Sequence, residues 1–450
     1  MVLSFWLELE FSMKSKSRKD LSFQAAASDD VSVSADDVAV NKVPGQWSVL
    51  RNRNFALFFW GELISSTGTQ MQVVAVAWQV YQLTHSAVML GVIGLLQAIP
   101  RLIFSLVGGV LADTFDRRKL LLIVEVILAM TSVILALSTA FKVINIAIFC
   151  GVVLISATVS AFEFPSRQSM IPSLVPPEQM ANAVSLNTVM MQVTMIGGST
   201  LGGLAIAQIG VVNTYWLDVV SYCIVIGSLL LMVVPRIPLE KRAQAGWGGM
   251  RDGIQFLRSH PILLAVLFLD FFATLFGSPK ALLPVYASDI LHVGPQGLGI
   301  LLGSISLGAV ALTPLTGKIS RIARQGMGVV LAIMGWGICI ILFGLAPGPL
   351  WLSALLLAGA GAADMVSMVL RHLLVQLTTP DEFRGRMGAV TAMFVVGGPM
   401  LGQFESGLVA GVTTTQFSVI SGGVACMVAT LIIVALVPNL FKMKSTSQAG

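Results

Sequence analysis

Eight charged side chains interrupt apolar runs long enough to cross a membrane, and they are the residues of this sequence best placed to do chemistry. A charge in the hydrocarbon core is costly unless it faces a partner or a water-filled cavity. The acids could take up and release protons, and the cations could bind an anion or hold helices together. The eight are Glu62, Arg101, Glu125, Asp218, Asp270, Lys280, Asp364 and Glu405.

Three of these residues lie at similar depths when counted along their apolar runs, namely Glu62, Arg101 and Glu125. We expect Arg101 to pair with Glu62 or Glu125, which leaves one carboxylate free to titrate. Burial disfavours the charged form of a carboxylate, so such an acid can exchange a proton near neutral pH. Glu62 is therefore a candidate for proton or substrate binding, with a structural ion pair as the alternative. Arg101 either braces the helices or binds an anionic substrate.

The acids of the second half of the chain offer a further candidate site. Asp270 and Lys280 are separated by ten residues, or about 15 Å along a helix, so they cannot pair with each other. Asp364 and Glu405 are the candidate proton or substrate acids here, again with structural roles as the alternative. Asp218 lies near one end of its run, and we expect it to be solvated.

These side chains must be positioned by membrane helices, because the composition excludes a soluble globule. Hydrophobic residues make up 56% of the 450 residues and charged residues only 11%. The four cysteines show neither metal nor disulfide spacing, and we expect no metal and no cofactor. The sequence predicts an all-α integral membrane protein whose twelve helices cover residues 54–82, 86–112, 118–141, 144–164, 182–209, 214–234, 261–288, 296–320, 326–346, 350–370, 386–411 and 416–437.

The distribution of basic residues predicts the orientation of these helices. Nineteen of the 27 lysines and arginines, with Arg167 and Arg371 among them, lie in connections or ends that twelve passes make cytoplasmic, whereas only Lys142 lies outside. Both termini are therefore expected in the cytoplasm. The net charge of +5 reports this topology, and we expect no nucleic-acid partner.

Two halves of six helices each are indicated by the longest interior polar stretch and by internal repeats. We expect a disordered cytoplasmic tail at 1–46, a bundle at 47–234, a cytoplasmic linker at 235–260, a second bundle at 261–438 and a tail at 439–450. The glycine-rich segment at 198–203 is echoed at 398–403, and the preceding loop at 176–179 is echoed at 379–382. Two similar bundles around a central cavity are what alternating access requires.

A tight charged turn joins the second and third apolar runs. Its residues Gly109, Asp113, Arg118 and Lys119 resemble the loop between helices 2 and 3 of the major facilitator superfamily. Thr114 and Asp116 depart from the family pattern, which has a cation and a glycine at these places.

In that family the loop acid contacts the start of a helix in the opposite half. The resemblance implies that Asp113 holds the cytoplasmic side closed against a helix that begins near Arg386, where the helix dipole favours a carboxylate. Arg117 and Arg118 could form pairs between the halves with Glu163 or Glu178, or they could simply anchor the loop at the membrane surface.

Small residues in the fifth and eleventh helices resemble the antiporter signature of drug-exporting members of the same superfamily. The alternative is close helix packing of the kind that is common in membrane proteins. The residues are Gly198, Gly202 and Gly203 in the fifth helix and Gly398, Pro399 and Gly402 in the eleventh.

Residues 47–440 resemble the branch of the superfamily that holds the enterobactin exporter and related drug and macrolide efflux proteins. The motifs that carry the resemblance lie at 50–55, 68–72, 111–118 and 164–168. The resemblance implies a proton-driven exporter of a siderophore or amphipathic drug, acting as a monomer in a bacterial inner membrane. Its partners would be the lipid bilayer, a small-molecule cargo and protons.

Other classes of function remain as alternatives. Uptake of a small polar solute would call for more charge in the cavity and fewer antiporter-like glycines. A membrane sensor would be expected to carry an added soluble domain. For an enzyme we find no nucleophile elbow, no paired metal ligands and no nucleotide loop, and the four histidines are scattered over four connections.

Overall fold

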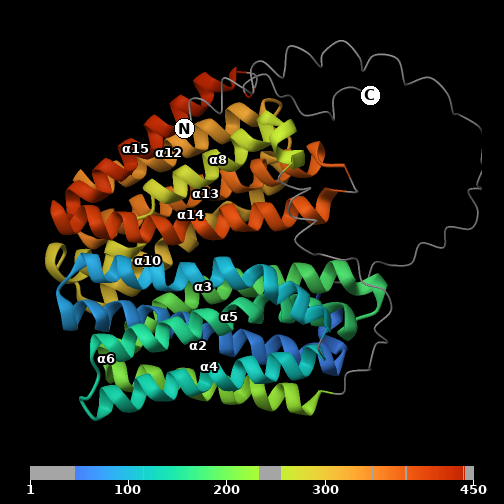
Figure 1. The fold of residues 1–450 in the computed structure, drawn as a ribbon, viewed down its shortest axis with the longest axis vertical. Coiled ribbons are helices and arrows are strands. Elements are labelled where there is room, and N and C mark those ends of the chain that lie inside the picture. The colour runs from blue at the N-terminus through green and yellow to red at the C-terminus, as the bar shows by residue number, and fades with distance from the viewer. Residues whose placement is uncertain are drawn as a thin grey trace, which may run out of the picture. The chain divides into compact units, whose positions relative to one another are not determined.

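The computed structural model describes residues 46–114, 116–232, 255–345, 348–380, 383–438 and 440. The described chain is helical throughout and contains no strand (Figure 1). After a short 3-10 helix η1 (Gln46–Arg51), the first half contains α2 (Arg53–Thr84), α3 (Ala87–Thr114), α4 (Arg117–Ala140), α5 (Ile146–Leu174), η2 (Pro177–Gln179) and α6 (Met180–Leu231).

The second half repeats this plan with more interruptions (Figure 1). It begins with α8 (Pro261–Phe276), whose pass continues through the short elements η3 (Lys280–Leu282), α9 (Leu283–Val285) and η4 (Tyr286–Ile290). The remaining elements are α10 (Gly294–Ala311), η5 (Thr313–Leu315), α11 (Thr316–Ile319), α12 (Gln325–Leu345), α13 (Leu350–Thr378), α14 (Arg384–Val412) and α15 (Thr415–Leu436).

These helices account for the twelve predicted passes. Nine segments of the described chain are long and apolar enough to cross a membrane. One of them contains α6, which is 52 residues long and changes direction at Gly210, where φ is +82°, so this segment supplies two passes. The helices α2 and α14 are 32 and 29 residues long, which is also sufficient for a crossing. The predicted fold class is thus confirmed.

Polar residues before the helices explain where three of them begin. The Asn52 side chain accepts a hydrogen bond from Asn54 N at 3.1 Å at the start of α2. The Asp116 side chain accepts from the backbone of Arg118 and Lys119 at 3.0 and 3.3 Å at the start of α4. Asn145 does the same for α5. Such caps satisfy backbone N–H groups that have no partner within the helix.

Two helices extend farther than their predicted ends, which corrects the sequence interpretation. The helix α5 continues through Pro165 and Pro172 to Leu174, and α13 continues to Thr378. A proline is tolerated in a membrane helix because neighbouring helices and side chains satisfy the freed backbone groups. Arg167 and Arg371 therefore lie inside helices, and their assignment to cytoplasmic connections was wrong.

Each half packs around its own core. In the first half α2 lies mainly against α6, and α4 packs on both α5 and α6. The core between them includes Phe55, Leu121, Leu128 and Met170, all nearly inaccessible to solvent. In the second half α12 lies between α13 and α15, and α8 packs on α14 and α15.

The described end of the predicted linker, residues 255–260, packs against the second bundle. The Phe256 ring stacks on His260 and Phe383 at centroid distances of 4.1 and 4.6 Å, and Leu257 is buried beside Leu263. The rest of the linker up to residue 254 lies outside the described residues, as do the tails before residue 46 and after residue 440.

The two bundles meet along two helix pairs, α3 with α14 and α6 with α10 (Figure 1). Glycines allow the close approach: a Cβ added to Gly203 would lie 2.7 Å from Gly299 Cα, and one added to Gly407 would lie 2.8 Å from Gly91 Cα. A hydrogen bond from the Tyr81 hydroxyl to the exposed Asp289 links the end of α2 to η4. These contacts lie toward the end of the bundles where α2 finishes and α3 begins.

We expect the substitution Gly203→Ala to destabilise the protein by about 1–3 kcal/mol, because the new methyl group would meet the backbone of α10, which cannot move aside cheaply. The measurement is thermal unfolding of the purified protein in detergent. Gly197→Ala is the matched control, since a Cβ there meets nothing within 4 Å, and we expect it to stay within about 1 kcal/mol of wild type. Equal stability of the two variants would contradict the close contact.

Candidate functional site

An arginine and two acids form a buried cluster in the first bundle. Arg167 on α5 approaches Glu62 on α2 with a distance of 2.6 Å between Nη2 and Oε2, and the Glu62 side chain has no solvent exposure. The same Nη2 donates a hydrogen bond to Glu163, one turn earlier on α5. Nη1 donates to Ser66 Oγ at 3.1 Å. One guanidinium group therefore serves acids from two helices.

Both acids use the same terminal nitrogen of Arg167. Glu163 accepts a hydrogen bond from Nη2, and Glu62 Oε2 lies 2.6 Å from the same nitrogen, within ion-pair distance. The charge of Arg167 therefore stabilises two carboxylates at once. This leaves Glu62 as a buried acid whose partner is already shared.

The predicted pairing of Arg101 with Glu62 or Glu125 was wrong. The partner of Glu62 is Arg167, which sequence reasoning had placed in a loop. Within the described part of the chain, Arg101 makes no ion pair shorter than 4.0 Å, and it interacts electrostatically with Glu163. The spacing of Glu163 and Arg167, four residues apart on a helix, was the signal available in the sequence.

Asp218 lies inside the bundle, contrary to the expectation that it is solvated. Its side chain has no exposure. Gln72 donates a hydrogen bond to Ser132 Oγ at 2.7 Å, and Ser132 donates to Asp218 Oδ2, also at 2.7 Å. Gly68 makes room for this acid, because a Cβ at that position would lie 2.8 Å from Asp218 Oδ1. Asp218 is buried because it faces the side of α2 that carries Gly68 and Gln72. The sequence does not reveal this contact, since it depends on how the helices pack.

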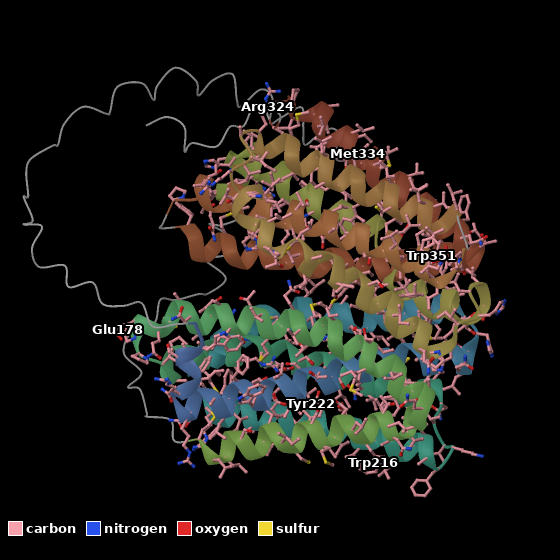
Figure 2. All side chains as sticks on the ribbon, turned by 180° about the vertical axis from the view of Figure 1, so that it is seen from behind. Glu178, Trp216, Tyr222, Arg324, Met334 and Trp351 are labelled. Carbon is pink, nitrogen blue, oxygen red and sulfur yellow. The ribbon has the colours of Figure 1, made fainter. Side chains whose placement is uncertain are left out.

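Glu125 on α4 is a further acid in the interior of this bundle. Its side chain has no exposure, and neither carboxyl oxygen has a hydrogen-bond partner among the described residues. It interacts electrostatically with Glu163, Glu62, Arg167 and Asp218. Tyr222, labelled in Figure 2 among the helices of the first bundle, donates to or accepts from Thr69 at 3.1 Å beside this group.

The second bundle holds a smaller cluster around Arg371 on α13. The Arg371 side chain donates to Asp270 on α8, and both residues are buried. Its other terminal nitrogen lies 3.7 Å from Asp364 Oδ1, a side chain that is 44% exposed. Glu405 is half-buried and has no ion pair among the described residues, and Lys280 is exposed. Asp270 therefore finds its partner on the fourth helix of its half.

The two ion pairs occupy equivalent positions in the two halves. Glu62 and Asp270 are each the tenth residue of the first helix, counted from Arg53 and Pro261. Arg167 and Arg371 are each the twenty-second residue of the fourth helix, counted from Ile146 and Leu350. Both halves thus join their first and fourth helices by a buried acid–arginine pair. Sequence reasoning missed both arginines because it ended both helices too early.

The basic residues after the charged turn act within the first bundle. The Arg117 side chain donates to the carbonyl of Ser169, and Arg118 donates to the carbonyls of Leu229 and Leu230 at 2.7 and 3.0 Å. They satisfy the carbonyl groups near the ends of α5 and α6, so the predicted pairs with Glu163 or Glu178 do not form.

The turn that is predicted to close the cytoplasmic side also contains Gly109, Asp113 and Lys119. Lys119 is exposed. The side-chain surroundings of Gly109 and Asp113 lie outside the described residues, and so does the side chain of Arg386.

The antiporter-like small residues lie at helix contacts. A Cβ on Gly202 would lie 2.8 Å from Met71 Cα, and one on Gly402 would lie 2.4 Å from the carbonyl oxygen of Leu275. Gly198 faces Thr67 and Gln70, Gly398 faces Phe271 and Thr274, and Pro399 lies inside α14. These contacts fit close packing of the fifth helix on the first and of the eleventh on the seventh. The antiporter role stays a prediction.

A family model described as a transmembrane secretion effector matches residues 44–449, almost the whole chain. The chain belongs to this family of major facilitator transporters. Similar proteins include the enterobactin exporter EntS of Shigella boydii serotype 18 and of Escherichia coli O81. Each is 26% identical to this chain over 385 residues, which are 85% of this chain and 92% of the exporter.

Solved structures show the same fold at lower identity. The nucleoside transporter NupG has a TM-score of 0.64 at 15% identity, with 87% of this chain and 98% of that chain covered. A bacterial homologue of the iron transporter ferroportin in the inward-facing state has a TM-score of 0.65 at 15% identity, with 85% and 98% covered. As a member of the secretion effector family, the protein is a multi-pass membrane transporter. Members of this family lie in the lipid bilayer and carry small molecules.

We expect Arg371→Ala to destabilise the transporter by about 3–5 kcal/mol, because it leaves the Asp270 carboxylate buried without a counter-charge. Thermal unfolding in detergent measures the effect. The double variant Asp270→Asn with Arg371→Met should regain most of the lost stability, since neither charge then remains. Arg321→Ala, at an exposed position, is the control. A double variant as unstable as Arg371→Ala would show that the pair is not what stabilises this contact.

Proposed function

We infer that the protein is a secondary active exporter in a bacterial inner membrane, which exchanges protons for a siderophore or an amphipathic drug. The observation that carries this proposal is the buried Glu62–Arg167 pair in a chain of the transmembrane secretion effector family. A buried acid held by a shared arginine can bind a proton in one conformation and release it in another. The protein acts as a monomer with both termini in the cytoplasm.

The contacts between the bundles support alternating access. The bundles meet where α3 begins and α14 ends, through Gly91 and Gly407, and where α10 begins, through Gly299. The basic residues, most of which lie in the connections at the opposite end, support placing this end at the outer face. In that orientation the contacts close the outer side, and rocking of one bundle against the other would open it.

Proton exchange at Glu62 supplies the coupling. With Glu62 ionised, Arg167 is paired with two carboxylates, and cargo enters from the cytoplasm. After reorientation, a proton from outside binds Glu62, and its attraction to Arg167 weakens. Return to the inward-facing state releases the proton into the cytoplasm. Each cycle thereby moves a proton inward and cargo outward. Asp364 and Glu405 are the alternative proton sites in the second bundle, where Asp364 is within ion-pair distance of Arg371.

The cargo class rests on two observations. The enterobactin exporters are similar over 92% of their length. In addition, a group of phenylalanines on α8 and α14 provides aromatic surface: Phe394 contacts Phe268 and Phe271 with ring centroids 5.6 and 5.9 Å apart. Such rings suit the aromatic groups of a catecholate siderophore or of an amphipathic drug.

Transport in inside-out vesicles tests the proposal. With an imposed proton gradient, we expect wild type to accumulate a catecholate siderophore or a fluorescent amphipathic dye, and Glu62→Gln to lose gradient-driven accumulation because it cannot bind a proton. Glu178→Gln is the control, since this exposed acid lies at the end of the first bundle (Figure 2).

Two results would contradict the proposal. Accumulation by Glu62→Gln at the wild-type level would remove Glu62 as the proton site, and Asp364→Asn and Glu405→Gln would then be compared in the same assay. Absence of gradient-driven accumulation of either cargo by wild type would remove the exporter assignment itself.

A further inference from the structure

We propose that Glu125 is a second proton-binding site of this transporter and that it carries a proton in the conformation described. The claim that Glu125 is neutral stands on the structure alone. The claim that its proton takes part in coupling rests on the proposed function. Glu125 lies on α4, the third helix of the first bundle, whereas Glu62 and Arg167 lie on α2 and α5.

The first argument is the absence of any partner for a charge. The Glu125 side chain has no solvent exposure, and in the part of the chain that the structure describes neither of its oxygens has a hydrogen-bond partner. An ionised carboxylate in such a place would lose its hydration without compensation, which costs far more than burying the neutral acid. The neutral form is therefore the stable one.

The second argument is the charge balance of the surrounding helices. The groups that act on Glu125 are Glu62 from α2, Glu163 and Arg167 from α5, and Asp218 and Tyr222 from α6. Glu62, Glu163 and Glu125 thus share Arg167, and the fourth acid, Asp218, acts on Glu125 and Glu163. Arg101 on α3 adds one more positive charge near Glu163. With all four ionised, negative charge would exceed positive charge in a buried site, which is strongly unfavourable.

Three of these acids have partners that favour the ionised form, and one has none. Glu62 has the Arg167 ion pair, Glu163 accepts a hydrogen bond from Arg167, and Asp218 accepts one from Ser132. Since hydrogen bonds and opposite charges stabilise carboxylates, the first proton that this excess of negative charge calls for resides on Glu125.

The third argument is a difference between the two halves. Glu125 is the ninth residue of α4 counted from Arg117, and the ninth residue of α12 counted from Gln325 is Ile333. Ile333 is as buried as Glu125. The second bundle therefore keeps its acid–arginine pair with an apolar residue at the equivalent position. A bundle of this design packs without an acid there, so the acid in the first bundle serves another purpose.

Sharing of Arg167 provides the link to transport. When Glu62 takes up a proton, one negative charge leaves the arginine, and the positive charge of Arg167 is then available to stabilise an ionised Glu125. The O–H bond on Glu125 can break as an O–H bond on Glu62 forms, so that the cluster keeps its net charge while the proton changes position. Two acids coupled in this way titrate as a pair.

Infrared spectroscopy of the full-length protein in liposomes at neutral pH tests the proton on Glu125 without cargo or gradient. Protonated carboxylic acids give a C=O stretching band separate from the carboxylate bands, and it shifts on exchange into D2O. We expect the wild-type minus Glu125→Gln difference spectrum to show loss of one such band, and the difference with Glu178→Gln to show none. Loss of carboxylate absorbance in Glu125→Gln would overturn the proposal, as would an unchanged protonated band.

Further variants keep the test decisive if Glu125→Gln folds poorly. Glu125→Asp should shift the band rather than remove it, and Glu125→Ile, which copies Ile333, should unfold at a temperature no lower than wild type. A large loss of thermal stability in Glu125→Ile would mean that an ionised, paired Glu125 holds the bundle together, contrary to the proposal.

The coupling role is measured separately in the inside-out vesicles. We expect Glu125→Gln to lose gradient-driven accumulation of the amphipathic dye and to keep dye exchange in the absence of a gradient. If wild type shows no gradient-driven transport, the proposed function fails while the infrared result still decides the protonation of Glu125. Full gradient-driven transport by Glu125→Gln would restrict the transported proton to another site and overturn the coupling role.

Discussion

A charge buried in a membrane bundle must find a counter-charge, and this constraint organises both halves of the transporter. Arg167 joins the first and fourth helices of one bundle through Glu62, and Arg371 joins the equivalent helices of the other through Asp270. Removing one partner would leave the other without compensation. The pairs therefore fix which faces of these helices point inward, and the remaining polar groups are arranged around them.

The two halves share this framework and differ in what they add to it. The first bundle adds Glu125, Asp218 and Glu163, while the second adds the half-exposed Asp364 beside its arginine. At the position equivalent to Glu125 the second bundle has Ile333. The structural pair is thus common to both halves, whereas the acidic side chains around it are not.

Close helix packing supplies the second constraint. The bundles touch through glycines such as Gly203 and Gly299, where any side chain would meet backbone atoms. Contacts between small residues give van der Waals attraction without interlocking side chains. The same residues that resemble an antiporter signature are thus, in the structure, the residues that let helices approach one another.

The sequence by itself determined the number of passes, the fold class and the positions of most intramembrane charges, because hydrophobic length and the cost of burying charge act locally along the chain. The position of Glu62 inside a membrane helix, for example, follows from the apolar run around it. The tertiary structure alone decided the partners: Arg167 replaced Arg101, Asp218 proved to be buried, and Arg371 moved from a loop into a helix. Pairing depends on which helix faces meet, and residues more than one hundred positions apart, such as Glu62 and Arg167, carry no local signal of that meeting.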